Sequence, residues 1–212
     1  MENSNKNTLK ERIIEVASEM FSTYSCKQIT MDTIAKEMGI SKRTIYENFS
    51  DKEMLLEKCI SHILEKENYF ERLKSENNPN FLITLSKFSD LHSSESFKLH
   101  CASTQDIIKY YPEIYNTCII PKNKQIIEIV TDLLQKSQND GYIDSKIDIN
   151  IATSMLGEII KAIIYGKVFF ENECSKTEII EQTLFVYLRG MATKKALEEY
   201  DEYKISNTEQ SI

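Results

Sequence analysis

The stretch from Thr30 to Lys52 constrains the fold more than any other part of the chain. Its sequence, TMDTIAKEMGISKRTIYENFSDK, contains two runs with apolar residues at helical spacing, separated by Gly39. A helix often ends at a residue with positive φ, a conformation that glycine adopts without a Cβ clash. Ser41 and Thr30 are residue types that cap a helix N-terminus. The stretch therefore predicts a helix-turn-helix.

The second helix of this pair is amphipathic in an unusual way. Ile45 and Phe49, one turn apart, are its expected buried residues. Its other faces carry many side chains that can bond phosphates or base edges, namely Lys42, Arg43, Thr44, Tyr46, Glu47 and Asn48. This composition favours nucleic-acid binding over a plain solvated face.

The spacing resembles the DNA-binding region of TetR-type transcriptional regulators. The residues that carry the resemblance are Thr30, Ile34, Ala35, Gly39, Ile40, Ser41, Thr44, Ile45, Tyr46, Phe49 and Lys52. The resemblance implies an N-terminal three-helix DNA-binding domain over residues 1–57. A larger helical domain for effector binding and dimerisation would follow over residues 58–205, with a frayed tail over 206–212.

Composition independently favours an all-α fold. The chain has five glycines and three prolines in 212 residues, and no segment alternates with the period of a strand. We expect helices near residues 8–23, 50–70, 81–91, 96–110, 112–139, 148–170 and 176–203.

The net charge of −7 argues against a protein that coats DNA without regard to sequence. Residues 1–58 hold nine Lys or Arg against ten Asp or Glu, so any contact with DNA must come from local arrangement. A ligand-independent structural DNA-binding protein is the alternative function, and it would be expected to have a basic chain.

Several other classes of protein have little support in the sequence. No window approaches the roughly 20 apolar residues of a membrane span, and the polar start is unlike a signal peptide, so we expect a cytoplasmic protein without a membrane partner. The five cysteines form no C-x-x-C pair, and the three histidines lack metal-ligand spacing. No nucleophile–base pair or phosphate loop is visible, so we expect no catalysis, metal or cofactor.

The resemblance also assigns roles at DNA. Phosphate contacts fall to Thr30, Tyr46 and Lys52, with Thr44 as a further candidate. Base contacts fall to Lys42, Arg43, Glu47 and Asn48, because these side chains match the exposed edges of guanine, cytosine or adenine. Ser41, at the start of the same helix, completes the predicted DNA-binding set.

The two predicted helices near residues 148–170 and 176–203 are rich in apolar residues and contain small residues that let another helix approach closely. They can form the interior of a bundle or, as the resemblance implies, a two-fold dimer interface. The interface candidates are Gly157, Ala162, Gly166, Leu184, Leu188 and Gly190.

The resemblance further implies a pocket for a small-molecule effector. The candidate lining residues are Phe88, His92, His100, Tyr110, Tyr111, Ser154 and Glu158. For Ser154 and Glu158, a solvent-facing strip is the alternative. The resulting hypothesis is a homodimeric repressor that binds a palindromic DNA operator and is released by its effector.

Overall fold

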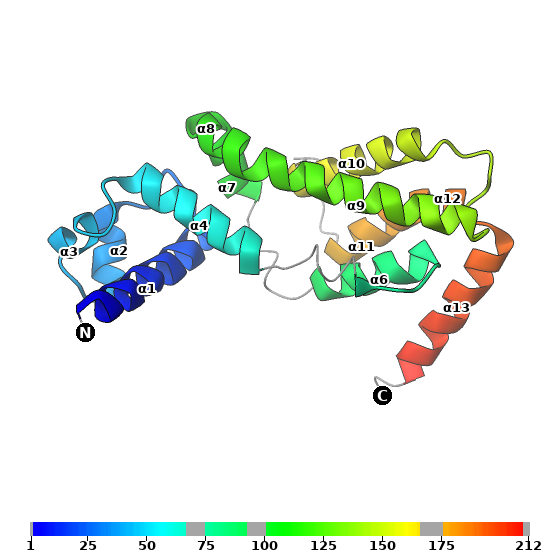
Figure 1. The fold of residues 1–212 in the computed structure, drawn as a ribbon, viewed down its shortest axis with the longest axis horizontal. Coiled ribbons are helices and arrows are strands. Elements are labelled where there is room, and N and C mark those ends of the chain that lie inside the picture. The colour runs from blue at the N-terminus through cyan, green and yellow to red at the C-terminus, as the bar shows by residue number, and fades with distance from the viewer. Residues whose placement is uncertain (1, 67–74, 93–100, 166–175, 210–212) are drawn as a thin grey trace. The chain divides into compact units, whose positions relative to one another are not determined.

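The computed structural model describes residues 2–66, 75–92, 101–165 and 176–209 (Figure 1). Within these ranges the regular structure is helical, and Ile143 and Ala192 form an isolated antiparallel bridge in place of a sheet. The prediction of an all-α fold is confirmed.

The chain divides into two compact units, and the division does not follow the order of the sequence. The first unit comprises Met1–Asn68 and Ser96–Asn123, and the second comprises Tyr69–Glu95 and Lys124–Ile212. A single boundary after residue 57 was expected. The first unit instead includes residues 96–123, which are separated from its N-terminal part by residues 69–95 of the second unit.

The first unit contains α1 (Glu2–Thr23), α2 (Met31–Met38), α3 (Lys42–Tyr46), α4 (Lys52–Lys66), α7 (Cys101–Tyr110), α8 (Pro112–Ile114) and the π-helical segment η2 (Tyr115–Ile119). Helix α1 packs along α4, α2 packs on α1, and α3 packs on α2 (Figure 1). The expected start of the first helix near Thr8 was wrong, because α1 continues back to Glu2.

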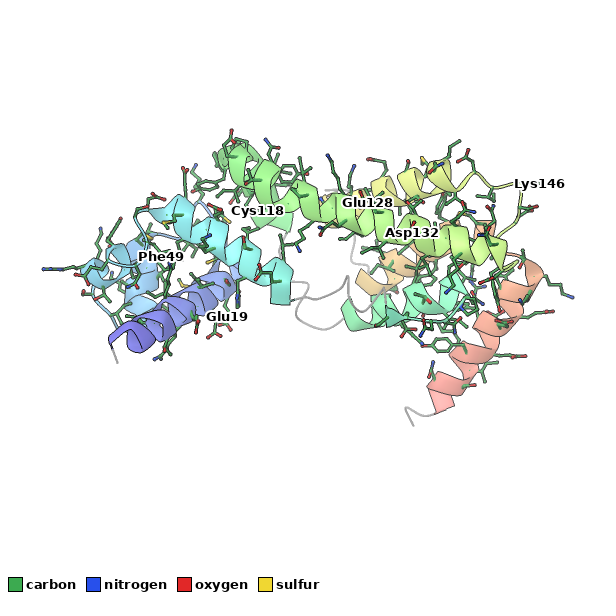
Figure 2. The ribbon with its side chains drawn as sticks, viewed as in Figure 1. Glu19, Phe49, Cys118, Glu128, Asp132 and Lys146 are labelled. Carbon is green, nitrogen blue, oxygen red and sulfur yellow. The ribbon has the colours of Figure 1, made fainter. Side chains whose placement is uncertain are left out.

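The core of the first unit joins residues from both of its segments. Ile45 and Phe49 are 0% and 1% exposed, as their spacing predicted, and Phe49 points inward in Figure 2. Ile107, Ile114 and Ile119 belong to the same apolar cluster. Residues 107–119 therefore complete a core that the N-terminal helices share.

The second unit contains α6 (Phe81–His92), α9 (Ile120–Asn139, which includes the boundary between the units), α10 (Ile149–Tyr165), α11 (Lys176–Ile180), the π-helical segment η4 (Glu181–Phe185), α12 (Val186–Met191) and α13 (Lys194–Glu209). Helix α6 packs against α13, and α10 packs against η4. Its core includes Phe81, Leu134, Leu156, Leu188 and Tyr200.

The expected single helix over residues 176–203 was wrong, because it is interrupted at Ala192. Ala192 is extended, with ψ of 142°, and the Thr193 amide donates to the Tyr142 carbonyl at 3.0 Å. This pairing with a loop replaces the intrahelical bond and starts a new helix, α13. Helix α13 runs to Glu209, so the expected frayed tail over 206–212 was wrong for residues 206–209.

Candidate nucleic-acid interface

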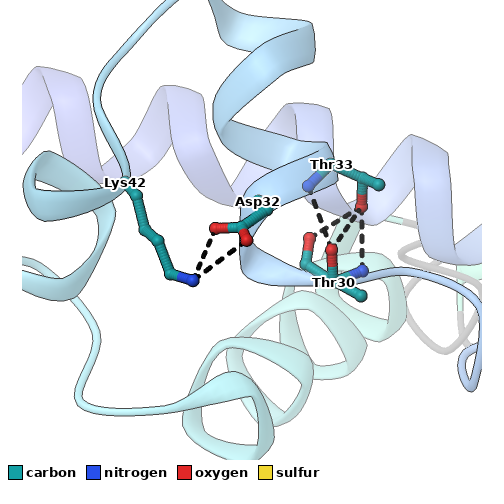
Figure 3. Close-up of polar contacts among 4 residues, drawn as sticks. All are labelled: Thr30, Asp32, Thr33 and Lys42. Atoms are coloured by element: carbon teal, nitrogen blue, oxygen red, sulfur yellow. Dashed lines mark hydrogen bonds and ion pairs between the residues drawn. The ribbon is translucent and has the colours of Figure 1, made fainter.

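Helix α2 is fixed at both ends by local contacts. The Thr33 amide donates to Thr30 Oγ1 at 3.1 Å, and the Thr30 amide donates to Thr33 Oγ1 at 2.8 Å, a reciprocal cap (Figure 3). Gly39 ends the helix with φ of 65°, a region that a Cβ makes unfavourable. The sequence predicted Thr30 as the N-cap and Gly39 as the end of the helix, but not the reciprocal bond from Thr33. The Thr30 hydroxyl, predicted to contact a phosphate, is exposed and acts as the cap.

Helix α3 follows after a short turn. Ser41 Oγ accepts the Thr44 amide proton at 3.1 Å, which confirms Ser41 as the N-cap. At the other end, the Asn48 side-chain amide donates to the Thr44 carbonyl at 2.8 Å. This bond uses a donor that was predicted to contact adenine, and both Thr44 and Asn48 are half-buried. Buried Ile45 holds the helix on the core.

The exposed side of α3 presents two basic side chains, each paired with an acid. Lys42 Nζ lies 2.8 Å from Asp32 Oδ1, and Arg43 Nε lies 2.9 Å from Glu47 Oε1 (Figure 3 for Lys42). The hydrogen bond to Asp32 raises the pKa of Lys42, so the ammonium form is retained. Because both pairs are exposed, water and salt screen them, and either cation can exchange its acid for a phosphate.

Tyr46 lies beside Lys42 on the same helix. Its side chain is 45% exposed, and its ring centroid is 5.9 Å from Lys42 Nζ. The structure therefore brings Ser41, Lys42, Arg43, Tyr46 and Glu47 together on one exposed surface. We call these five residues the α3 surface.

The start of α4 is capped differently from the sequence prediction. The Ser50-Asp-Lys-Glu53 sequence has the pattern of a capping box, in which Ser50 would cap the helix, but Asp51 Oδ1 accepts the Met54 amide proton at 2.8 Å. This backbone bond is the largest cause that lowers the pKa of Asp51. A carboxylate at a helix N-terminus is also stabilised by the helix dipole.

Lys52, the first residue of α4, has an internal partner. Its ammonium donates to the Cys26 carbonyl in the loop before α2, and it lies 5.8 Å from the centre of the Tyr111 ring. Partial burial lowers the pKa of Lys52. Lys52 was predicted to contact a DNA phosphate, but it would have to leave both partners to do so.

Sequence reasoning missed the acid that pairs with Lys42. Asp32 lies on a different helix, ten residues before Lys42, so no helical spacing connects the two. It also missed the partners of Lys52, which come from the loop before α2 and from the turn after α7. The capping motifs were found because their partners are three residues apart.

The dimer candidates have different positions in the second unit. Leu188 is 0% exposed within its own core, so its assignment to an interface was wrong. Leu184 is partly buried against the same core. Ala162 is exposed, and a Cβ on Gly190 would meet no atom within 4 Å. Gly157 is half-buried, whereas Gly166 lies outside the described residues.

The predicted pocket residues are divided between the two units. Tyr110 and Tyr111 belong to the first unit, whereas Ser154 and Glu158 lie on the exposed side of α10 in the second. Ser154 Oγ donates to the Asn150 carbonyl, and Glu158 pairs with Lys161 at 2.6 Å, contacts that fit the solvent-facing alternative.

The side chains of the three remaining pocket candidates lie outside the described residues. These candidates are Phe88 and His92, which lie in α6, and His100. Among the side chains that are described, no group of three His, Cys, Asp or Glu is arranged to hold a metal ion. No helix in the described ranges is long and apolar enough to cross a membrane.

The family model for bacterial regulatory proteins of the tetR family matches residues 13–59, from α1 into α4. An HTH-type transcriptional regulator of Staphylococcus aureus (strain USA300) is 25% identical over 144 residues, which cover 66% of this chain and 74% of the relative.

Two solved structures have the same fold over most of the chain. A TetR-family regulator from Agrobacterium tumefaciens matches with a TM-score of 0.71 at 14% identity, covering 89% of this chain and 100% of that one. SmeT, the repressor of the Stenotrophomonas maltophilia multidrug efflux pump SmeDEF, matches with a TM-score of 0.67 at 16% identity, covering 88% and 92%. SmeT also has a solved complex with triclosan. Residues 13–59 therefore form a helix-turn-helix region of the tetR family type, and over most of its length the chain has the fold of TetR-family transcriptional regulators.

Proposed function

We propose that this protein is a homodimeric repressor that binds a palindromic operator and is released by a small-molecule effector. The observation that carries the proposal is the α3 surface, where Lys42 and Arg43 project from a helix anchored by buried Ile45. A five-residue helix with a capped start and an exposed basic side fits the part of a helix-turn-helix that enters the major groove.

The contacts to DNA divide by chemistry. Arg43, whose side chain is 88% exposed, is positioned to contact guanine, and Glu47 can accept from the cytosine amino group. We assign Lys42 to phosphate together with Tyr46, in place of the base contact that the resemblance implied for Lys42, because an ammonium and a phenol both donate to phosphate oxygens. Asn48 keeps its side-chain oxygen for a base while its amide caps α3.

Dimerisation is supported by exposed apolar side chains on α10 and α12. Ile151 is 65% exposed, Met155 49% and Val186 59%. The two helices contact each other, since the Tyr187 hydroxyl donates to the Ala152 carbonyl at 3.0 Å. Apolar side chains exposed on adjacent helices are typical of a surface that a second copy covers. We place the dimer interface here, with Ala162 and Gly190 at positions where a partner helix can approach.

Release by an effector follows from differential affinity. In one conformation of the dimer, the two α3 helices cannot enter successive major grooves. A ligand that binds this conformation more tightly lowers the affinity for the operator, and the operator lowers the affinity for the ligand by the same factor. The solved SmeT–triclosan complex supports a small organic molecule as the class of effector, by analogy of fold.

Selection from a random-sequence DNA duplex library tests the operator proposal. The expected product is an inverted repeat whose half-sites are centred about one helical turn apart. Enrichment of a single unrepeated site would exclude the two-fold arrangement. The absence of any enriched sequence would favour the ligand-independent structural alternative.

Sedimentation velocity tests the interface. Ile151→Arg is expected to produce a folded monomer, because a charge cannot be buried between two copies without a partner. Ile205→Arg is the matched control, since Ile205 is 62% exposed on α13, outside the proposed interface. A dimer that survives Ile151→Arg, or a wild-type protein that is monomeric at micromolar concentration, would refute the proposed interface.

A further inference from the structure

We propose that α7 and the turn after it are a clamp that positions the helix-turn-helix for DNA, with Asp106 as its central positioning residue. These residues lie beyond the segment 13–59 that matches the family model. The proposal rests on the DNA-binding function but not on the identity of an effector. It begins from polar contacts that join residues 24–30, the loop between α1 and α2, to residues 106–111.

The first contacts come from α7 itself. Ser25 Oγ donates to Asp106 Oδ2, and the ammonium of Lys27 lies 5.3 Å from the centre of the Tyr110 ring. Ser25 and Asp106 are both half-buried, so water competes less for their hydrogen bond than at the surface. A hydrogen bond from a hydroxyl to a carboxylate is stronger than one between two neutral groups. The loop is thus attached to α7 at two places.

A second set of contacts reaches the same loop from α4. Lys52 donates to the carbonyl of Cys26, and its ammonium lies against the Tyr111 ring. Lys52 is the first residue of α4, whereas Cys26 is four residues before the Thr30 cap of α2. Tyr111 directly follows α7, so one lysine connects the turn after α7 to both flanks of the helix-turn-helix.

The position of these contacts explains why they affect DNA binding. The helix-turn-helix spans α2 and α3, and the clamp holds the residues just before α2 and just after α3. Fixing both flanks limits how α3 can tilt relative to the rest of the unit. Ile107, Ile114 and Ile119 reinforce the attachment, because they are buried in the core that also contains Ile34 and Ile45. Residues 101–119 therefore belong to the unit that contains the helix-turn-helix.

The test uses two variants that remove the same charge from the same unit of the full-length protein. Asp106→Ala removes the clamp carboxylate, and Glu113→Ala removes an exposed carboxylate from α8. By charge alone, both variants would bind DNA somewhat more strongly, because each removes a repulsion from phosphates. A positioning role predicts the opposite sign for Asp106→Ala: operator affinity about tenfold weaker than for Glu113→Ala, the effect of losing one hydrogen bond to a charged group.

Further variants distinguish positioning from a general loss of structure. Ser25→Ala should weaken binding as Asp106→Ala does, and the double variant should add little more, because both remove one hydrogen bond. Asp106→Asn, which can still accept from Ser25, should recover part of the affinity. Affinity is measured by fluorescence anisotropy well below the melting temperature, with circular dichroism confirming native helicity.

Hydrogen exchange in the DNA-free protein gives a readout that needs no operator. Asp106→Ala should speed exchange selectively at residues 24–30, and Glu113→Ala should not. Operator affinities of the two variants within twofold of each other, or faster exchange spread over the whole unit, would overturn the clamp. If selection yields no operator, the proposed repressor function fails, and the exchange pattern at residues 24–30 still decides the clamp.

Discussion

Asp32→Asn is expected to strengthen binding to DNA of any sequence. In the free protein Lys42 Nζ lies 2.8 Å from Asp32 Oδ1 and 2.9 Å from Oδ2, with both side chains about half exposed. Before Lys42 can neutralise a phosphate, it must leave this carboxylate, which then regains a counterion from solution. The substitution removes both steps, because a neutral amide of the same shape holds Lys42 weakly.

The size of the effect follows from counting counterions. One additional phosphate neutralised without compensation steepens the dependence of log Kd on log salt by about 0.9. Lowering the salt from about 200 to about 50 mM would then increase the advantage of Asp32→Asn over wild type by roughly three- to fourfold. The gain should be equal for operator and random duplexes, since phosphates carry no sequence information directly.

Fluorescence anisotropy with labelled duplexes over a salt series measures both quantities. Glu37→Gln is the matched control, because it removes one negative charge from the exposed side of the same helix, α2, and no ion pair with Lys42 is seen there. Equal behaviour of the two variants would mean that only net charge matters. Weaker binding by Asp32→Asn would refute the reasoning, because it would show that the pair persists in the complex and orients Lys42.

Three further predictions concern single side chains. Arg43→Ala should relax the preference for one base pair in each half-site, at about 1–3 kcal/mol for a lost bidentate contact; an unchanged selection profile would exclude Arg43 from base contact. Lys52→Met should lower the melting temperature without changing the salt slope, because Lys52 is bonded to the Cys26 carbonyl; a slope reduced by about one would restore its predicted phosphate role. Burial raises the pKa of Cys59 to about 12, so its thiol should resist labelling in the native protein. The pKa of this thiol is higher in the folded than in the unfolded protein, so above about pH 8.5 the unfolded chain loses the proton first. The free energy of unfolding should therefore be unaffected by Cys59 below about pH 8.5 and should fall as pH rises towards 12, which urea titrations at several alkaline pH values can check.

The sequence alone determined the local geometry of the helix-turn-helix. The caps at Thr30 and Ser41, the positive φ of Gly39, and the burial of Ile45 and Phe49 all followed from residue type and spacing. Each depends on partners within four residues, or on which face of one short helix is apolar. Such interactions are encoded where they occur, so the chain's fold class and DNA-binding class could be predicted from them.

The tertiary structure alone decided which groups meet across the sequence. Periodicity shows that a helix has an apolar face but not which element covers it. Leu188 was therefore assigned to a partner chain, although it packs in its own core. The same limit applies to charges: Lys42 pairs with Asp32 across two helices, and Lys52 turns to a backbone carbonyl that carries no side-chain signal. The inclusion of residues 107–119 in the DNA-binding unit depends on long-range packing, since a buried isoleucine has the same sequence signature in either unit.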